Sequence, residues 1–498
     1  MGAEVTSIRF THEDRRRFRR KVHECTEALE RMLRDGAFER LRAVPLLGME
    51  VELNLVDEHM EPAKANDTVL EAIADTDYQT ELGRFNIELN VAPAPLSGNS
   101  IAQVESKLRS SLEHADDVAA RNHARLVLTG MLPTLRTEHF DAAWITDNPR
   151  YALLNDQIFA ARGEDIEIDI SGTGLDGRPE RLRIDCTSVL PEAACTSVQL
   201  HLAVDPEMFA SYWNAAQCIA GVQVALGANS PFLAQTSLWH ESRIPVFEQA
   251  IDTRSWELKN QGVRPRVWFG ERWITSIFDL FDENARYFPA LLPEVDDEEP
   301  LALLDSGGVP KLAELAMHNG TIYRWNRPVY AVVDGEPQMR VENRVLPCGP
   351  TVVDTIANAA FYYGTVHALA NAERPLWSQM SFGAAASNLK AGAQQGMDAR
   401  FYWPTFGEVG PDELVLRWLL PLADQGLADY GASQEVRDRY LGIIEERCLS
   451  GRNGAAWQRA TVARLEAKGR TRGEALTQML AEYAEHMRVG APVHTWPW

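Results

Sequence analysis

Four short segments of this chain alternate apolar residues with side chains that can bind metal ions or phosphate. Successive side chains of a β-strand point to opposite faces of a sheet, so each polar set would lie on one face. None of the four sets contains lysine, whereas Glu, Arg and Asn dominate them. The polar sets are Glu50, Glu52 and Asn54; Arg84, Asn86, Glu88 and Asn90; Ser197, Gln199 and His201; and Gln338, Arg340, Glu342 and Arg344.

If these strands belong to one sheet, Glu50, Glu52, Glu88 and Glu342 converge on it. Clustered carboxylates repel one another unless a cation neutralises them, and Mg²⁺ prefers carboxylate oxygens. Arginines among them suit bidentate binding of phosphate or carboxylate. These are the groups that phosphoryl transfer needs. The pattern predicts an enzyme that uses a metal and a nucleotide, although each strand alone also fits an antiparallel sheet with one solvated face.

Three further candidates lie outside these strands. The segment 318–328 mixes aromatic and guanidinium groups around Arg324, which suits a nucleotide, and equally suits a core tryptophan flanked by surface arginines. Asn229 follows a predicted helix and is a candidate nucleotide contact, although its turn also reads as simple helix termination. Arg243, like Arg324, is a candidate for holding a substrate carboxylate or the nucleotide, with a surface role as the alternative.

Hydrophobic periodicity places these segments in an α+β fold. The turns between strands favour antiparallel pairing, and no strand leads into GxGxxG or GxxxxGK[ST]. Strands are predicted at 47–56, 84–91, 126–132, 198–204, 329–333 and 339–346, a hairpin at 165–186, and helices at 12–34, 68–74, 101–115 and from the end of the fourth strand to 226.

The chain also divides by composition near Pro404–Pro411. We expect a catalytic domain with an N-terminal helix at 1–405 and a helical region packed on it at 411–498. The sequence leaves open whether this second region forms a lid, supports a homo-oligomer or only packs behind the sheet.

Charge and cysteine content limit the partners and the compartment. The formal net charge of −22 makes binding to nucleic acid or a membrane surface unfavourable, but a local arginine cluster can still bind a small anion. The basic run 15–21 is followed closely by glutamates, which is typical of a solvated helix face. Six cysteines without a CxxC pair, no signal-like N-terminus and no long apolar stretch predict a cytoplasmic protein acting on small molecules.

Taken in order along the chain, these motifs resemble the glutamate–cysteine ligase superfamily, in its bacterial carboxylate–amine ligase branch. No single motif is specific to this superfamily. The order and number of the motifs over about 46–405 make the match fairly strong. The matching motifs are Gly48-Met49-Glu50-Val51-Glu52, Glu81 seven residues before Glu88, Val198-Gln199-Leu200-His201, Asn229-Ser230-Pro231, Glu342-Asn343-Arg344, and Asn388 followed by Gly396-Met397-Asp398-Ala399.

The resemblance implies a concave, mainly antiparallel six-stranded sheet and an ATP- and Mg²⁺-dependent ligase. In such enzymes ATP phosphorylates the γ-carboxylate of glutamate and an amine attacks the acyl phosphate. Arg344 and Glu52 would be catalytic, with Arg324, Arg340 and Asn229 near the nucleotide and Arg243 and Arg84 near the substrate. The implied metal ligands are Glu50, Glu52, Glu81, Glu88, Gln199, His201 and Glu342, although Gln199 stands where some relatives have His.

Three other functions remain open at this point. The amine can differ from cysteine, and the acid from glutamate. A non-catalytic nucleotide or metabolite binder of the same fold is the main alternative, although a protein without catalysis would tolerate loss of the costly carboxylate cluster. A glycosidase with two carboxylates would leave the arginine-bearing strands unexplained.

Overall fold

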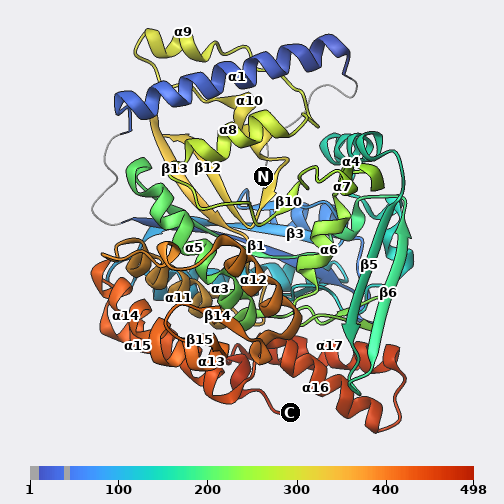
Figure 1. The fold of residues 1–498 in the computed structure, drawn as a ribbon. Coiled ribbons are helices and arrows are strands. Elements are labelled where there is room, and N and C mark those ends of the chain that lie inside the picture. The colour runs from blue at the N-terminus through green and yellow to red at the C-terminus, as the bar shows by residue number, and fades with distance from the viewer. Residues whose placement is uncertain (1–9, 39–44) are drawn as a thin grey trace.

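The computed structural model describes residues 10–38 and 45–498 and is built around one antiparallel sheet (Figure 1). The strand order is β12-β13-β7-β1-β3-β2, and β4 pairs with the end of β1. The predicted α+β class is confirmed, with a seventh strand beyond the six expected. The strands are β1 (Leu46–Val56), β2 (Tyr78–Thr80), β3 (Asn86–Pro95), β4 (Arg125–Val127), β7 (Val198–Ala203), β12 (Asn326–Val333) and β13 (Glu336–Asn343).

The strand β3 differs from its prediction at both ends. Arg84 precedes the strand, and pairing with β1 continues as far as Pro95. Beyond Leu89, β1 is the only neighbour of β3, because β2 is short. Proline is tolerated where one strand edge is open, so Pro93 does not stop the strand.

A layer of helices covers the apolar face of the sheet (Figure 1). Helix α5 is buried almost all round from Phe209 onward, as expected of a helix enclosed by protein. A Cβ at Gly221 of α5 would lie 2.5 Å from the Asn388 backbone, so glycine permits the close approach of α12. The layer contains α3 (Ser100–Arg121), α5 (Pro206–Gly227), α11 (Val352–Ala370) and α12 (Phe382–Gln395).

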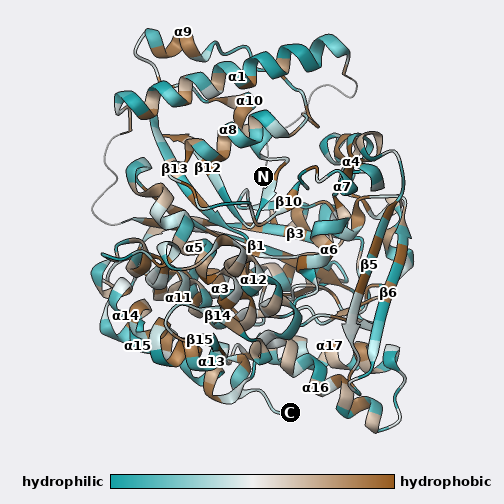
Figure 2. Ribbon diagram, viewed as in Figure 1, coloured by the Kyte–Doolittle hydropathy of each residue, from teal (hydrophilic) through white to brown (hydrophobic). Residues whose placement is uncertain are grey.

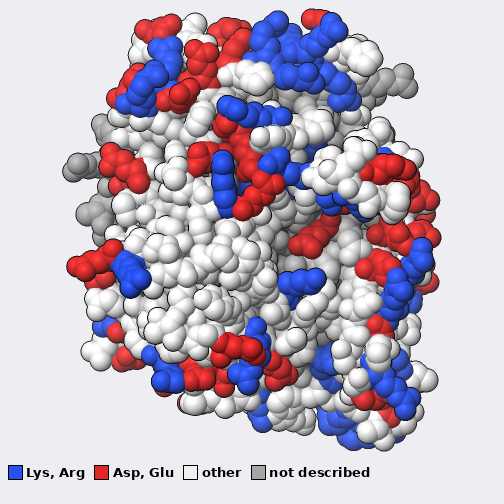
Figure 3. Space-filling model, viewed as in Figure 1, with Lys and Arg blue, Asp and Glu red and all other residues white. Residues whose placement is uncertain are grey.

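Other helices stand over the polar face. The long helix α1 begins at a capping box formed by Thr11 and Asp14 and ends at Gly36, whose φ is 68°. Its outer side is hydrophilic (Figure 2), and its basic residues gather at the top of Figure 3, which confirms the predicted solvated face except at Lys21, which is buried and pairs with Glu299. These helices are α1 (His12–Asp35), α4 (Pro149–Arg162), α8 (Phe278–Tyr287), α9 (Pro300–Asp305) and α10 (Ala313–Asn319).

Shorter elements complete the first 410 residues, and among them the predicted hairpin is confirmed as β5 paired with β6. They are α2 (Asn66–Ile73), β5 (Ile166–Thr173), β6 (Pro179–Cys186), β8 (Phe232–Leu233), β9 (Thr236–Ser237), α6 (Arg243–Ala250), α7 (Trp256–Asn260), β10 (Val267–Trp268), β11 (Tyr323–Arg324), β14 (Phe401–Trp403) and β15 (Gly407–Val409).

The C-terminal region is helical, as predicted, and it packs against α11. Arg447 of α15 forms an ion pair of 2.7 Å with Asp354 of α11, and both side chains are almost completely buried. Trp496, near the end of the chain, is buried against Trp457. The division at residue 411 stays a prediction. The helices are α13 (Pro411–Leu414), α14 (Leu420–Asp429), α15 (Gln434–Ser450), α16 (Gly454–Ala467) and α17 (Arg472–Val489).

Two features bear on the expected environment of the chain. All six cysteines are free thiols. Across residues 10–38 and 45–498, no helix has both the length and the apolar character needed to cross a membrane.

We expect Arg447→Ala to destabilise the protein by about 3–5 kcal/mol, because it leaves the Asp354 carboxylate buried without its cation. Urea unfolding followed by circular dichroism measures this loss. Arg417→Ala is the matched control, since its pair with Glu413 is largely exposed and contributes about 0.5 kcal/mol or less. Equal losses in the two variants would show that the buried pair does not hold the C-terminal helices.

Candidate functional site

The pairing of the central strands brings the predicted polar positions to one face of the sheet. Cross-strand partners project to the same face. The common face predicted from the alternation is therefore confirmed. The facing pairs are Glu52 with Glu88, Glu50 with Gln199, and His201 with Glu342.

A cavity of about 420 Å³ lies over this face. The sheet supplies its charged floor, whereas α4, α8 and α10 supply largely apolar walls that include Leu154, Phe281 and Met317. Excluding water in this way strengthens every charge interaction inside. The charged and polar lining residues are Glu50, Glu52, Glu81, Glu88, Glu192, Glu342, Arg150, Arg327, Arg340, Arg344, Gln199 and His201.

Two arginines hold one carboxylate at the end of the floor. Arg344 Nη1 lies 2.6 Å from Glu342 Oε1, and Arg327 Nη2 lies 2.9 Å from Glu342 Oε2. Burial alone would raise the pKa of Glu342, but the two guanidinium groups hold it well below its usual range. The same attraction outweighs burial at Arg344 and raises the pKa of its guanidinium. The two ion pairs with Glu342 fix both guanidinium groups in orientation.

Gln199 connects this arginine cluster to Glu52. Its amide nitrogen donates to Glu52 Oε1 at 2.9 Å, and its carbonyl oxygen accepts a hydrogen bond from Arg344. The backbone N–H of Ser197 donates to Glu52 Oε2 at 2.6 Å. The oxygen of Gln199 expected to bind metal is thus engaged by an arginine here, so its ligand role stays a prediction.

The remaining carboxylates of the floor lie close to one another. Burial and the neighbouring Glu88 raise the pKa of Glu81 well above its usual value. Burial and then Glu50 raise the pKa of Glu88 to about 7, and burial and then Glu52 raise that of Glu192 to about 7. At Glu50, burial is outweighed by His201, whose Nε2 lies 3.1 Å from Oε1, and the pKa is lowered. The floor therefore has an arginine-rich end at Glu342 and an end where the carboxylates Glu81 and Glu88 lie close together.

This end suits Mg²⁺ by the chemistry of its donors. Within the described ranges, no three His, Cys, Asp or Glu side chains stand close enough together to enclose a metal ion. Mg²⁺ does not require such a cage, because it commonly takes one or two carboxylates together with water and substrate phosphates. Glu50, Glu81 and Glu88 can provide those carboxylates, and a cation would offset the repulsion that raises the pKa of Glu81 and Glu88.

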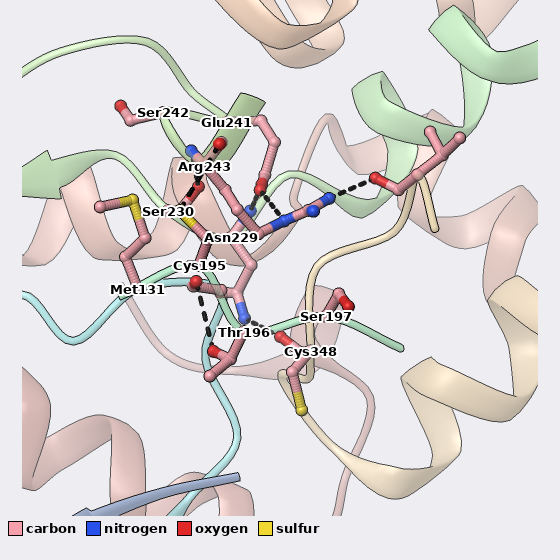
Figure 4. A network of polar contacts seen from close by, with 12 residues as sticks. Met131, Cys195, Thr196, Ser197, Asn229, Ser230, Glu241, Ser242, Arg243 and Cys348 are labelled. Carbon is pink, nitrogen blue, oxygen red and sulfur yellow. Dashed lines mark hydrogen bonds and ion pairs between the residues drawn. The ribbon is translucent and has the colours of Figure 1, made fainter. Parts of the chain in front are cut away.

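Asn229 and Arg243 do not line this cavity (Figure 4). The Asn229 amide donates to the carbonyl of Cys348 at 2.7 Å and to the Tyr483 hydroxyl at 2.8 Å. Arg243 pairs with Glu241, which is completely buried, at 3.1 Å and donates to the Val345 carbonyl. Both residues form hydrogen bonds that hold loops together behind the site. These contacts explain why an asparagine and an arginine occupy the two positions.

Arg324 and Arg84 also lie outside the cavity lining. Arg324 is buried, pairs with Glu283 at 2.8 Å, and stacks over Trp268. Arg84 precedes β3 and donates to the Ile145 carbonyl at 3.1 Å. The proposed nucleotide and substrate roles of these two arginines receive no support from their positions, whereas Arg340 does line the cavity.

Sequence reasoning did not single out Glu192, Arg150, Arg327 or Tyr323, which all line the cavity. Arg327 belongs to the segment 318–328 described above. It lies on the same face of the sheet as Arg340 only because β12 and β13 pair. Glu192 lies in a short 3₁₀ turn and Arg150 at the start of α4. At these positions no hydrophobic periodicity in the sequence indicates that a side chain faces a site.

Comparison with solved structures shows similar folds. A glutamate–cysteine ligase from Francisella tularensis in complex with AMP is 14% identical, with a TM-score of 0.56, over 91% of this chain and 90% of that one. A bifunctional glutathione synthetase from Pasteurella multocida is 10% identical, with a TM-score of 0.47, over 89% and 53%. The ligase PafA in its complex with Pup is 8% identical, with a TM-score of 0.37, over 88% and 72%. None of the curated proteins compared with the chain matches it significantly.

The antiparallel sheet and its helices thus share the fold of the glutamate–cysteine ligase from Francisella tularensis. The sequence profile of glutamate–cysteine ligase family 2 matches residues 46–482, which is most of the chain. The protein belongs to this family, and the resemblance predicted from its motifs is confirmed.

We expect Arg243→Met to lower the free energy of unfolding by about 3–5 kcal/mol, because Glu241 loses its buried partner. Nucleotide affinity of the folded protein, measured below the melting transition, should change less than about twofold. A stable Arg243→Met protein with weakened nucleotide or substrate binding would instead place Arg243 in the site.

The cavity wall should also respond to acid through His318 of α10. Its Nε2 lies 2.9 Å from the Asn284 carbonyl of α8, and burial lowers its pKa to about 4. The unfolded chain binds this proton near pH 6.5, so the histidine lowers stability as pH falls from about 6.5 to 4, by up to about 1.4 kcal/mol per pH unit. Urea unfolding across this range should show a shallower decline in His318→Gln. An unchanged slope would contradict the assignment.

Proposed function

We propose that this protein is an ATP- and Mg²⁺-dependent ligase that joins a carboxylate, expected to be glutamate, to an amine. The observation that carries the proposal is the uneven charge of one cavity floor, where two guanidinium groups fixed by Glu342 lie at one end and the neighbouring carboxylates Glu81 and Glu88 lie at the other. Phosphoryl transfer needs both kinds of group within one water-excluding site.

Glu50, Glu81 and Glu88 are the residues that would hold Mg²⁺ together with phosphate oxygens. Bound Mg²⁺ supplies charge compensation for the phosphate oxygens of ATP. Glu342 has a different part in this proposal, because Arg327 and Arg344 engage both of its oxygens. In this proposal Glu342 orients the two arginines and does not bind the metal.

Arg344 would face the transferring phosphoryl group. Within the described residues, its hydrogen bonds to Gln199 and Glu342 both use Nη1. Donors fixed before the reaction need no reorganisation when negative charge develops, and this is where electrostatic catalysis is most effective. Gln199 and Glu52 support that orientation through their shared hydrogen bonds.

The acid would lie where its carboxylate meets the γ-phosphate of ATP, with Arg340 and Arg150 in the lining to bind its remaining charge. Transfer of the phosphoryl group to the carboxylate releases ADP and forms an acyl phosphate. Attack by the amine forms the amide C–N bond, breaks the acyl C–O bond and releases phosphate. Holding both substrates in one cavity supplies much of the rate by orientation.

The test is Mg²⁺-dependent release of ADP from ATP with glutamate, screened across the amino acids and simple amines. We expect one amine to stimulate release, and Arg344→Ala and Glu88→Gln each to lower it by about 10²-fold or more. Chelation of the metal by EDTA should abolish the signal, and Mg²⁺ should restore it.

The matched controls are Arg183→Ala on the exposed hairpin and Glu336→Gln at the exposed start of β13, which should retain normal rates. Tight Mg·ATP binding without ADP release for any pair would contradict the ligase proposal and support a non-catalytic nucleotide binder. Release that EDTA does not affect would contradict the metal site.

A further inference from the structure

A second cavity of about 440 Å³ lies between β5, α6 and α12. It shares no lining residue with the catalytic cavity. Figure 3 shows a hollow on this face near α6 and α12, with acidic atoms on one side of it and basic atoms on the other. Its volume is within the range of small-molecule sites.

Three charged residues line this cavity, and one of them, Asp169, is already paired with Arg181. Glu248 of α6 and Lys390 of α12 both line it, and among the described residues neither takes part in a salt bridge. Burial raises the pKa of Glu248 to about 7, while the neighbouring Trp325 and the charge of Lys390 lower it in part. A partly buried carboxylate whose nearest lysine is not in direct contact with it gains from a ligand that brings a cation to it.

The rest of the lining is mainly apolar. Ile244 and Leu389 are buried, and Phe269 and Trp239 add aromatic surface. Gln249 and Gln394 supply amides beside the charged groups. An apolar wall between a carboxylate and an ammonium group complements a molecule with an ammonium, a carboxylate and an apolar side chain.

We propose that this second cavity binds a free apolar α-amino acid as its zwitterion, with the ammonium group at Glu248, the carboxylate at Lys390 and the side chain against Ile244, Phe269 and Leu389. A simple cation would leave Lys390 and the apolar wall unused, and a simple anion would leave Glu248 unpaired. The zwitterion is the ligand class that satisfies all three features together.

The position of α6 links this site to the catalytic cavity. Phe247 of α6 contacts Tyr323 with ring centroids 5.4 Å apart, and Tyr323 lines the catalytic cavity. Glu248 follows Phe247 on the same helix. The proposed binding does not depend on the ligase reaction, so it can be tested by itself.

The test is isothermal titration calorimetry of the full chain with L-leucine, L-methionine and L-phenylalanine. We expect at least one of them to bind, and Glu248→Gln and Lys390→Gln each to weaken its affinity by about tenfold or more, since each removes one charge-assisted contact. We expect two analogues of that amino acid, one without the ammonium charge (N-acetyl) and one without the carboxylate (amide), to bind the unaltered protein about as weakly as the amino acid itself binds the two variants.

Glu408→Gln and Lys468→Gln, which alter exposed residues elsewhere, are the matched controls and should keep full affinity. Thermal melts check that all four variants are folded. Failure of all three amino acids to bind would overturn the proposal. So would binding that survives Glu248→Gln and Lys390→Gln but is lost in Glu88→Gln, because the amino acid would then occupy the catalytic cavity.

Discussion

Repulsion among carboxylates gathered on one face of a sheet is the constraint on which the rest of this structure depends. Glu52 and Glu88 face each other across paired strands and are buried, and Glu50 lies on the same face of β1. Such an array is stable only with compensating charge, and the protein supplies it unevenly. Arg327 and Arg344 compensate one end, whereas Glu81 and Glu88 lie close together at the other, where we propose that a cation binds. The unevenness is what makes the cavity a candidate for phosphoryl transfer.

The strands that carry these charges must be held rigidly, because small displacements would change every interaction in the cavity. Their apolar faces pack on α5 and α11, and the C-terminal helices lock that layer from behind. Arg447 reaches Asp354 in the helix layer, and Tyr483 joins Asn229 to the carbonyl of Leu128. Residues with the chemistry of a binding site are used here as internal connections.

Much of the fold and of the polar face could be predicted from local pattern. A period of two is a strong signal, and it placed Glu50, Glu52, Glu88 and Glu342 on one face without knowledge of which strands pair. The short strand β2 was not predicted, and β3 continues past Pro93 because one of its edges is open. Both outcomes depend on neighbours that are distant in the sequence.

By itself, the sequence determined the class of fold, the acidic face and the family, because alternation and ordered motifs are local properties of the chain. Only the tertiary structure decided which charges meet. Arg243 and Arg324 are indistinguishable from Arg327 and Arg344 by residue type, yet the first two pair with buried carboxylates away from the cavity. Glu192 enters the cavity from a turn that has no periodicity. The reason is physical: a charged side chain takes its role from the partner and the solvent around it, and distant segments supply both.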